Sequence, residues 1–440
     1  MAPNPKMRVF IEAYGCTQNQ GEAAELRRQL SAAGHTMASE PTAADVGVLV
    51  SCGVIQSTED RMVRRWRTLT GCTPKVVVTG CLVPLRTAEF TGPGRERTLF
   101  VPIREQAELP RILASFPAHD PEESHRTAAV SPAVEDVVIA QGCTSHCSYC
   151  FSRLARGRLT SVPLPEVLRR VGAAVERGVT EIRLSSLDTS CWGEDLPGDL
   201  RLPDLLREVT SIGGDFQVRI GMMSPQSLQP IASDLWEALD DPHSYRFLHL
   251  PVQSGADRVL DGMRRGYHAG DFQSLVAEAR RRLPDLMLAT DVIVGFPGET
   301  DTEFSETLAL LDEVQPEIVN VTRFSARPLT PAARERPLPS HVVKRRSREL
   351  TQHRLRVARR RMERWIGQTV SVRFLERGQG TSTLGRLPNY LPLVAAGPQP
   401  IGTPVPVRVD GARSTYLLGR PLGGNEAGFE EPLPMLREGR

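Results

Sequence analysis

The chain has 440 residues, 40% of them hydrophobic and 24% charged, and its formal net charge is only +2. This composition is ordinary for a globular protein of about two to four domains. The chain contains no run of about 18 uncharged apolar residues, so no membrane span is expected. Because the first residues lack the apolar core of a signal peptide, the eight cysteines favour metal or redox chemistry in a reducing cytoplasm over a disulfide framework.

Residues 1–115 are predicted to form an α/β domain. Strand-like apolar runs occupy residues 8–14, 45–50 and 75–79, and helical spacing of apolar residues covers 21–33 and 58–69. Strands that alternate with helices indicate a parallel sheet with helices on both faces.

One cysteine follows each of these three strands: Cys16, Cys52 and Cys81, called here the N-terminal cysteines. The carboxyl ends of parallel strands share one edge of a sheet, where ligands collect, so the three thiols are predicted to converge on a cluster-binding site. Each of them alone is also explained as a packed core residue, because free cysteine is commonly buried. Cys72 lies in a turn-like segment and is interpreted as incidental.

Residues 116–135 are rich in proline, alanine, serine and charge and are predicted to be a linker. Residues 136–340 resume the alternation of strands and helices, and six such units indicate an open or partial parallel β/α barrel. The predicted strands cover residues 136–140, 181–185, 217–222, 246–251, 287–294 and 318–324.

The segment QGCTSHCSYC directly follows the first strand of this barrel and contains Cys143, Cys147 and Cys150, called here the motif cysteines. Three thiolates leave one iron of a 4Fe–4S cluster without a protein ligand, and an open metal position lets a small molecule bind and react. A zinc knuckle that uses His146 as its fourth ligand is the alternative. The spacing, with Tyr149 before the last cysteine, resembles the radical S-adenosylmethionine (SAM) signature.

Residues 341–366 are predicted to form a long helix with ten Lys or Arg against two Glu. Such one-sided charge suits an RNA phosphate backbone, and a solvated helix that covers the barrel explains it equally well. Short alternating segments separated by turn residues predict a basic, small β-barrel over residues 367–422. Its expected strands are 369–375, 391–395, 404–409 and 415–419, and residues 423–440 are expected to be a flexible tail.

The chain from about residue 8 to residue 421 resembles the radical SAM methylthiotransferases. The resemblance implies a cysteine-bearing α/β domain, a partial (β/α)6 radical SAM barrel and a TRAM-like β-barrel that binds RNA. The ARG after the motif cysteines, the SLDT segment and RIGMM are most similar to the archaeal and eukaryotic-type branch, which methylthiolates N6-threonylcarbamoyladenosine at C2 beside the tRNA anticodon. The matching stretches are AYGCTQNQGEAAEL, VLVSCGVIQSTEDRM, VVVTGC, QGCTSHCSYCFSRLARGRLTS, EIRLSSLDTSCWG, RIGMM, FLHLPVQSGADRVLDGMRRGY, ATDVIVGFPGETD and RFSARPLTPAA.

The resemblance also implies the cofactors and partners. The motif cysteines would hold a 4Fe–4S cluster that binds SAM. One electron, from a donor such as a flavodoxin or ferredoxin, would then cleave SAM to a 5′-deoxyadenosyl radical. The N-terminal cysteines would hold a second 4Fe–4S cluster that carries the sulfur to be inserted, and a second SAM would supply the methyl group.

Further SAM contacts are predicted where barrel strands end. Each of these predictions has a structural alternative. The serines and the aspartate after the second strand could instead cap a turn, Gly295 could form a tight loop, and the ring of Tyr149 could belong to the core. Arg153, Arg156 and Arg158 are candidates for contacts with substrate or with the SAM carboxylate, and a solvated loop is the competing interpretation. The candidate SAM residues are Tyr149, Ser185, Ser186, Asp188, Gln253 and Gly295.

Three positions depart from the pattern of the family. Val50 stands where the family usually has asparagine, Ser224 replaces the asparagine of GMMNP, and Ser190 replaces the glycine of DTG, next to an extra cysteine, Cys191. Because all six cluster cysteines are intact, these changes bear on the substrate. A tRNA is expected, a peptide or protein substrate is the alternative, and an RNA-binding iron–sulfur regulator without turnover is a third hypothesis.

Overall fold

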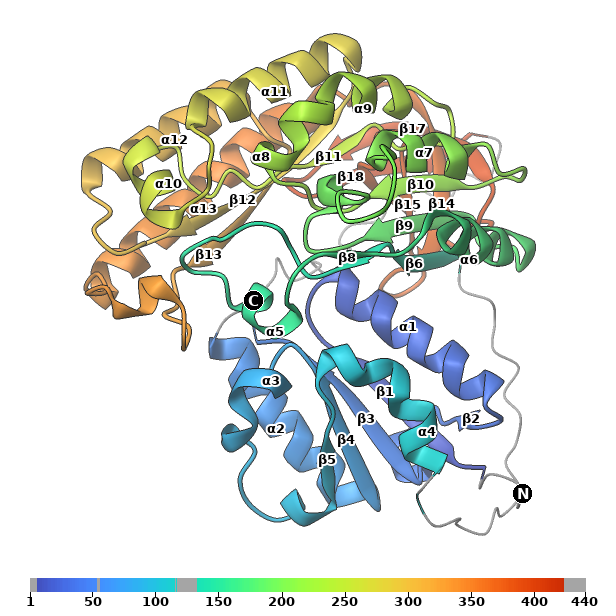
Figure 1. The fold of residues 1–440 in the computed structure, drawn as a ribbon. Helices are drawn as coiled ribbons and strands as arrows, with labels where there is room; N and C mark the ends of the chain where they lie inside the picture. Colours follow the sequence, from blue (N-terminus) through green and yellow to red (C-terminus); the bar gives the residue numbers. More distant parts are fainter. Residues whose placement is uncertain (1–5, 54–55, 115, 117–132, 423–440) are drawn as a thin grey trace.

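The computed structural model describes residues 6–53, 56–114, 116 and 133–422. Figure 1 shows an N-terminal sheet domain below an open barrel of strands and helices, with the C-terminal strands behind the barrel. The predicted tail, residues 423–440, and most of the predicted linker, residues 117–132, lie outside the described residues. Among the described helices, none has the length and apolarity that a bilayer crossing requires.

The N-terminal domain is a parallel sheet, as predicted, but it has five strands, two more than the sequence indicated. Its strands are, in sheet order, β2 (Thr36–Met37), β1 (Arg8–Ala13), β3 (Val46–Ser51), β4 (Lys75–Gly80) and β5 (Thr98–Phe100). Its helices are α1 (Thr17–Ala32), α2 (Gln56–Cys72), α3 (Val83–Arg86) and α4 (Leu109–Ala114). Leu26 and Leu109 pack α1 and α4 on one face, and Met62 and Trp66 pack α2 on the other. The sheet is therefore covered on both sides.

The central domain has the six parallel strands that the sequence predicted. They form two three-stranded sheets, and a bridge between Met222 and His249 joins the sheets into one open arc. The strands are β6 (Val134–Val138), β9 (Glu181–Ser185), β10 (Gln217–Ile220), β11 (Phe247–His249), β12 (Met287–Val294) and β13 (Ile318–Arg323). A short antiparallel pair, β7 (Ala140–Gln141) and β8 (Thr160–Ser161), adjoins the first strand.

Helices cover the outside of this arc (Figure 1), and their apolar faces share one core with the strands. This core includes Trp192, Trp236 and Phe272, each of them fully buried. The covering helices are α6 (Leu164–Glu176), α7 (Leu202–Thr210), α8 (Pro225–Leu228), α9 (Ala232–Leu239), α11 (Ala269–Arg282) and α12 (Asp301–Val314). Two further helices pack in separate apolar clusters: α10 (Asp257–Met263), and α5 (Phe151–Arg156), which lies against α3 of the N-terminal domain.

Helix α13 (Ser340–Glu363) is the predicted basic helix, and it packs against α12 and β13. The helix buries its own residues Leu350 and Val357. Many of its cationic side chains bond to acidic groups of this neighbourhood, for example Arg361 to Glu317 at 2.7 Å. Others are Arg345 with Asp301, Arg346 with Glu299 and Asp301, and Arg360 with Asp312. Much of the local charge is therefore neutralised within the chain, as a covering helix requires.

The C-terminal strands close into a five-stranded barrel, in the order β14-β15-β16-β18-β17. The strands are β14 (Thr369–Arg377), β15 (Thr383–Arg386), β16 (Pro392–Ala395), β17 (Pro404–Ala412) and β18 (Leu417–Pro421), and β15 is one more than the sequence predicted. The ring of Tyr390 lies 4.9 Å from those of Tyr245 and Phe247, measured between centroids. This aromatic group fixes the small barrel to the central domain.

Close backbone approach joins the N-terminal domain to the central one. A Cβ at Gly21 of α1 would lie 2.9 Å from Val138 Cγ2 and 3.1 Å from the carbonyl oxygen of Asp136, both on β6. One helix turn earlier, the Gln18 side chain donates a hydrogen bond of 3.1 Å to the carbonyl of Ala140. The start of α1 is therefore held against the strand that leads into the motif cysteines.

Candidate active site between the two cysteine sets

A cavity of about 460 Å³ lies where the carboxyl ends of the central strands face the start of α1. All three motif cysteines line it, and so does Cys16 from the other set. Five of the six SAM residues predicted from the sequence line it too, namely Tyr149, Ser185, Ser186, Asp188 and Gln253. The structure therefore brings most of the candidate residues to one place.

The loop of the motif cysteines is fixed by hydrogen bonds to its surroundings. The Ser148 hydroxyl donates to the carbonyl of Gly262 at 2.7 Å, and the Ser148 amide donates to that of Met263 at 2.9 Å, which ties the loop to α10. Gly142 precedes the loop with a φ of 72°, and an added Cβ would lie 1.9 Å from the carbonyl oxygen of Arg158. Only glycine fits this position.

Cationic and dipolar groups lie beside the motif sulfurs. Arg265 donates to Cys147 Sγ at 3.0 Å, and the amide of Ser145 donates to Cys143 Sγ at 3.4 Å. Burial, reinforced by the charge of Asp188, raises the pKa of the Cys143 thiol to about 11. A bare thiolate is thus costly here, and a bound cation would offset that cost.

The N-terminal cysteines also converge. Cys16 caps α1, and an added Cβ at Gly15 would lie 2.8 Å from Cys52 Sγ, so the Cys52 thiol lies against the backbone next to Cys16. Cys81 is fully enclosed, and burial raises its thiol pKa to about 12, with Cys16 and Cys52 acting in the same direction and Arg156 opposing them. The Cys81 amide donates to the carbonyl of Ser51, the residue before Cys52, at 3.0 Å, so Cys81 lies beside Cys52 at the same edge of the sheet.

Neither of the other two cysteines belongs to the N-terminal set. Cys72 donates to the carbonyl of Thr68, in its own helix, at 3.2 Å. Cys191 is buried beside the motif loop, where its sulfur lies 3.0 Å from the hydroxyl of Thr144.

Each cysteine set supplies three thiols, which are the donor type that holds iron–sulfur clusters. Within the described residues no three His, Cys, Asp or Glu side chains are grouped tightly enough to hold one metal ion. The thiolates of a cubane each bind a different iron, so they stand apart by the width of the cluster and do not meet at one point.

Three of the predicted SAM residues at the cavity carry a buried polar atom that has no hydrogen-bond partner within the described part of the chain: the hydroxyls of Ser185 and Ser186 and Oε1 of Gln253. Gln253 also has a left-handed backbone, with φ of 70°. Buried polar groups are normally satisfied, and strained backbone gathers at ligand sites. These groups are free to bind a polar ligand, which fits the amino-acid and ribose parts of SAM.

Asp188 and Gly295 are placed differently from these three residues. Asp188 accepts from the Ser224 amide at 3.2 Å and from the Ser227 hydroxyl at 2.6 Å, so it braces the loop at the cavity wall, as the capped-turn alternative requires. Gly295 is not among the residues that line the cavity. A Cβ there would lie 2.7 Å from Val343, which fits the tight-loop alternative.

Four ionisable residues to which sequence reasoning assigned no role also line the cavity: Arg219, His249, Arg265 and Asp291. His249 Nε2 lies 3.1 Å from Asp291 Oδ1. Burial by itself would raise the pKa of Asp291, but the interaction with His249 opposes it, and the pKa lies below its usual value. The sequence feature that could have identified these four residues is that each lies in a stretch that resembles the family, namely RIGMM, FLHLPVQ, GMRRGY and ATDVIV.

Three family models match the chain: "Uncharacterized protein family UPF0004" over residues 8–101, "Radical SAM superfamily" over 137–311 and "TRAM domain" over 363–422. Among solved structures, the radical SAM methyltransferase TsrM from Kitasatospora setae superposes with a TM-score of 0.53. It is 13% identical, with 74% of this chain and 77% of that chain covered, so it supports the fold alone.

Curated relatives match nearly the whole chain. One from Archaeoglobus fulgidus, named probable threonylcarbamoyladenosine tRNA methylthiotransferase, is 36% identical, with 94% of this chain and 98% of the relative covered. One from Danio rerio, named threonylcarbamoyladenosine tRNA methylthiotransferase, is 31% identical, with 94% and 78% covered. One from Chloroflexus aurantiacus, named tRNA-2-methylthio-N(6)-dimethylallyladenosine synthase, is 33% identical, with 94% and 91% covered.

The barrel and its matching model define a radical SAM enzyme, a class that uses SAM and a 4Fe–4S cluster. With the two flanking domains and the full-length relatives, the chain belongs to the radical SAM methylthiotransferase family. The expected fold class and enzyme class are thereby confirmed.

Proposed function

We propose that this enzyme methylthiolates C2 of N6-threonylcarbamoyladenosine beside the anticodon of a tRNA. The observation that carries the chemistry is the cavity that the three motif cysteines line together with Cys16 of the N-terminal set. The substrate rests on the printed names of the relatives from Archaeoglobus and Danio. The volume of about 460 Å³ lies within the ordinary range for a site that encloses a nucleoside-sized group.

In this proposal the motif cysteines hold the cluster that binds SAM, and the N-terminal cysteines hold a second 4Fe–4S cluster. Ser185, Ser186 and Gln253 bind polar groups of SAM through their unpartnered atoms. When bound, the clusters and SAM supply the one-electron chemistry that breaks an unactivated C–H bond, together with the sulfur and methyl group. A small one-electron donor such as a flavodoxin or ferredoxin is a further partner, and the cytoplasm is the compartment expected for a tRNA enzyme.

The chain's own residues orient these groups and exclude water. Ser148 fixes the motif loop to α10, and Asp188 holds the loop that carries Ser190 against Ser224 and Ser227. Arg265 places a buried positive charge beside Cys147. An enclosed cavity keeps reactive species from side reactions with solvent.

The β-barrel is the proposed tRNA-binding surface. Arg377, Arg408 and Arg413 are exposed on it, whereas many arginines of α13 are bound to carboxylates of the central domain. Exposed arginines neutralise phosphates and release counterions, so tRNA affinity should fall steeply as salt rises.

The test is mass spectrometry of tRNA nucleosides from a deletion strain complemented with the parent chain or with C16A/C52A/C81A. We expect 2-methylthio-N6-threonylcarbamoyladenosine to be absent from the deletion strain, restored by the parent and not restored by the variant. Loss of the 2-methylthio-dimethylallyl nucleoside instead would reassign the base. Unchanged methylthio nucleosides, with SAM still cleaved by the purified protein, would reject the tRNA substrate.

A further inference from the structure

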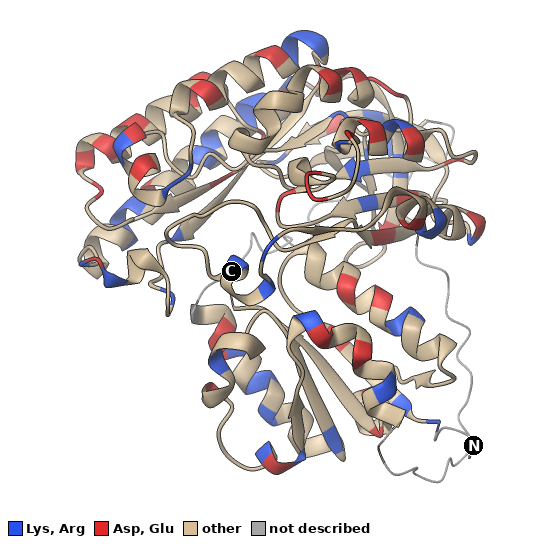
Figure 2. Ribbon diagram, in the orientation of Figure 1, with Lys and Arg blue, Asp and Glu red and all other residues tan. Residues whose placement is uncertain are grey.

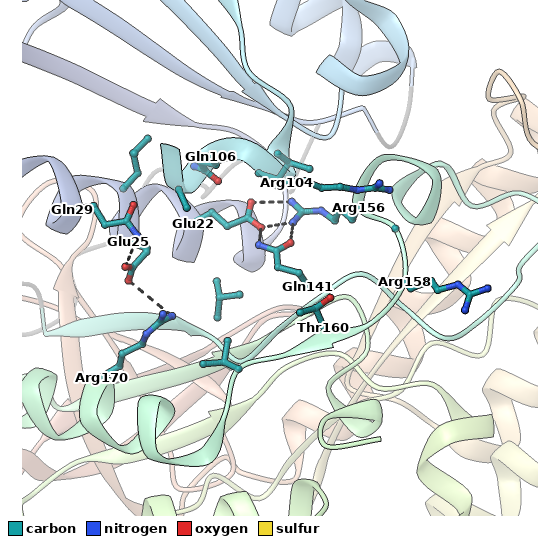
Figure 3. A pocket seen from close by; sticks show the side chains of 16 residues that line it. Glu22, Glu25, Gln29, Arg104, Gln106, Gln141, Arg156, Arg158, Thr160 and Arg170 are labelled. Carbon is teal, nitrogen blue, oxygen red and sulfur yellow. Dashed lines mark hydrogen bonds and ion pairs between the residues drawn. The ribbon is translucent and has the colours of Figure 1, made fainter. Parts of the chain in front are cut away.

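Arg156 ends helix α5, six residues after the last motif cysteine, yet its guanidinium lies among the N-terminal cysteines. Its Nε donates to Cys81 Sγ at 3.1 Å. The side chain has 0% exposure, so the contact is shielded from water. Figure 3 shows it between Glu22 of α1 and Gln141 of β7, on the wall of a second cavity at the seam of the two domains.

All five N–H donors of this guanidinium have partners. Besides the bond to Cys81, Nη2 donates to Asn19 Oδ1 at 2.7 Å and to Glu22 Oε2 at 2.9 Å. Nη1 donates to Gln141 Oε1 at 2.9 Å and to Glu22 Oε1. Only arginine presents five donors in a planar fork, so no other residue can make this set of bonds.

Asn19 extends the network to the other two N-terminal cysteines. Its Nδ2 donates to the carbonyl of Tyr14 at 2.6 Å and to that of Ser51 at 3.2 Å. These carbonyls lie two residues before Cys16 and one residue before Cys52. On the opposite side, Gly157, which follows Arg156, accepts from the amide of Cys143 at 3.3 Å. One side chain therefore connects the backbones that carry both cysteine sets.

We propose that Arg156 is a positioning residue that fixes the Cys81 sulfur, ties the two cysteine sets together and makes the second cluster easier to reduce. This inference rests on the second cluster of the proposed function. Hydrogen bonds to cluster and ligand sulfurs set reduction potentials, because a donor stabilises the extra negative charge of the reduced form. Glu22 is paired with the same guanidinium, and its negative charge makes the second cluster harder to reduce.

The experiment isolates the second cluster in the full chain by means of C143A/C147A/C150A, reconstituted with iron and sulfide. Iron content is measured first, and a dithionite titration followed by electron paramagnetic resonance then gives the reduction potential. We expect R156Q to make the potential more negative and E22Q to make it less negative. R170Q is the control, because Arg170 lines the same cavity but pairs with Glu166 of its own helix and Glu25 of α1, not with a cysteine.

Each outcome separates the inference from its premise. Absence of iron in C143A/C147A/C150A itself rejects the second cluster and with it the proposed function of the N-terminal cysteines. The role of Arg156 is overturned if iron is retained and neither R156Q nor E22Q changes the reduction potential of C143A/C147A/C150A. It is also overturned if both variants shift that potential in the same direction. If R156Q loses iron while its circular dichroism is unchanged, the positioning role is supported, and E22Q still tests the sign of the electrostatic effect.

Discussion

At the scale of single residues, Ser186 and Asp188 differ in what their polar atoms already bind. The Ser186 hydroxyl is buried with no hydrogen-bond partner among the described residues, whereas Asp188 accepts hydrogen bonds from four groups of three neighbouring serines. An unsatisfied buried hydroxyl destabilises the ligand-free protein. Its persistence at a cavity wall is explained if a ligand supplies the missing partner.

We therefore predict that S186A weakens SAM binding without destabilising the ligand-free protein. The loss of one hydrogen bond should cost about 1 kcal/mol of binding free energy, roughly a fivefold higher Kd. Anaerobic titration calorimetry of the cluster-loaded enzyme gives the Kd, and thermal unfolding without SAM gives the stability.

Two variants accompany this measurement. S211A removes an exposed hydroxyl that bonds only within its own helix end, so it should change neither quantity. D188N should lower the unfolding temperature, because an amide cannot accept all the bonds that the carboxylate accepts. A stability loss in S186A equal to that in D188N would contradict a ligand role for the hydroxyl.

At the scale of elements, the buried carboxylate of Glu317 is one of the groups that hold helix α13 to the central domain. Glu317 has 1% exposure and lies 2.7 Å from Arg361 of α13, and its other oxygen accepts from the amide of Leu288 at 2.9 Å. Arg280 and Arg364 approach the same carboxylate. Removal of this group would leave three guanidinium groups close together without their shared anion.

E317A should therefore lower the free energy of unfolding by about 3–5 kcal/mol, the usual cost of breaking a buried ion pair. Urea denaturation followed by tryptophan fluorescence measures it. E349A is the matched control, because Glu349 is exposed on α13, and it should stay within about 0.5 kcal/mol of the parent. Equal, small effects of both variants would show that the contacts of Glu317 do not stabilise the helix.

The charge of α13 shows where sequence reasoning stops. Ten cations in one helix are visible in the sequence, but their partners Asp301, Asp312 and Glu317 are apparent only once α12 and β13 pack beside it. Strand β15 was missed for a related reason. It is only four residues long, and a Cβ added at its Gly385 would lie 2.5 Å from Val372 Cγ1, a close fit that the closed barrel requires and local propensity does not indicate.

The strands and the cysteine positions were predictable because their signals are local. Long apolar runs mark buried strands, and a cysteine just after each of three parallel strands has to lie at one sheet edge. Arg156 carries no such signal. Its contact with Cys81 spans 75 residues and two domains, and it depends on how the domains pack, which neither periodicity nor spacing determines.

At the scale of the whole molecule, function requires the two domains to keep a fixed separation. Figure 2 shows acidic and basic residues interspersed along the ribbon of both domains, so the sign of the charge does not distinguish the two sides of the seam. The seam depends instead on close packing at Gly21 of α1 against β6, on Gln18 and on the Arg156 network. A larger side chain at Gly21 has to push α1 away from Val138.

We predict that G21V uncouples the two halves of the reaction. Overpacking of this kind costs about 1–3 kcal/mol and moves backbone, and a misplacement of about 1 Å at reacting groups can cost about a hundredfold in rate. SAM cleavage needs only the motif cysteines and their cavity wall, so it should continue. The methylthio nucleoside should fall about a hundredfold, because sulfur and substrate are no longer aligned.

The assay follows 5′-deoxyadenosine and methylthiolated nucleoside together in single turnovers of enzyme carrying the parent's full iron content. G71V is the control, because an added Cβ at Gly71, near the exposed end of α2, would meet nothing within 4 Å, and its product ratio should match that of the parent. If G21V lowers both products equally, the seam supports folding or cluster loading in general. If it lowers neither, the spacing at Gly21 does not control how the two cysteine sets face each other.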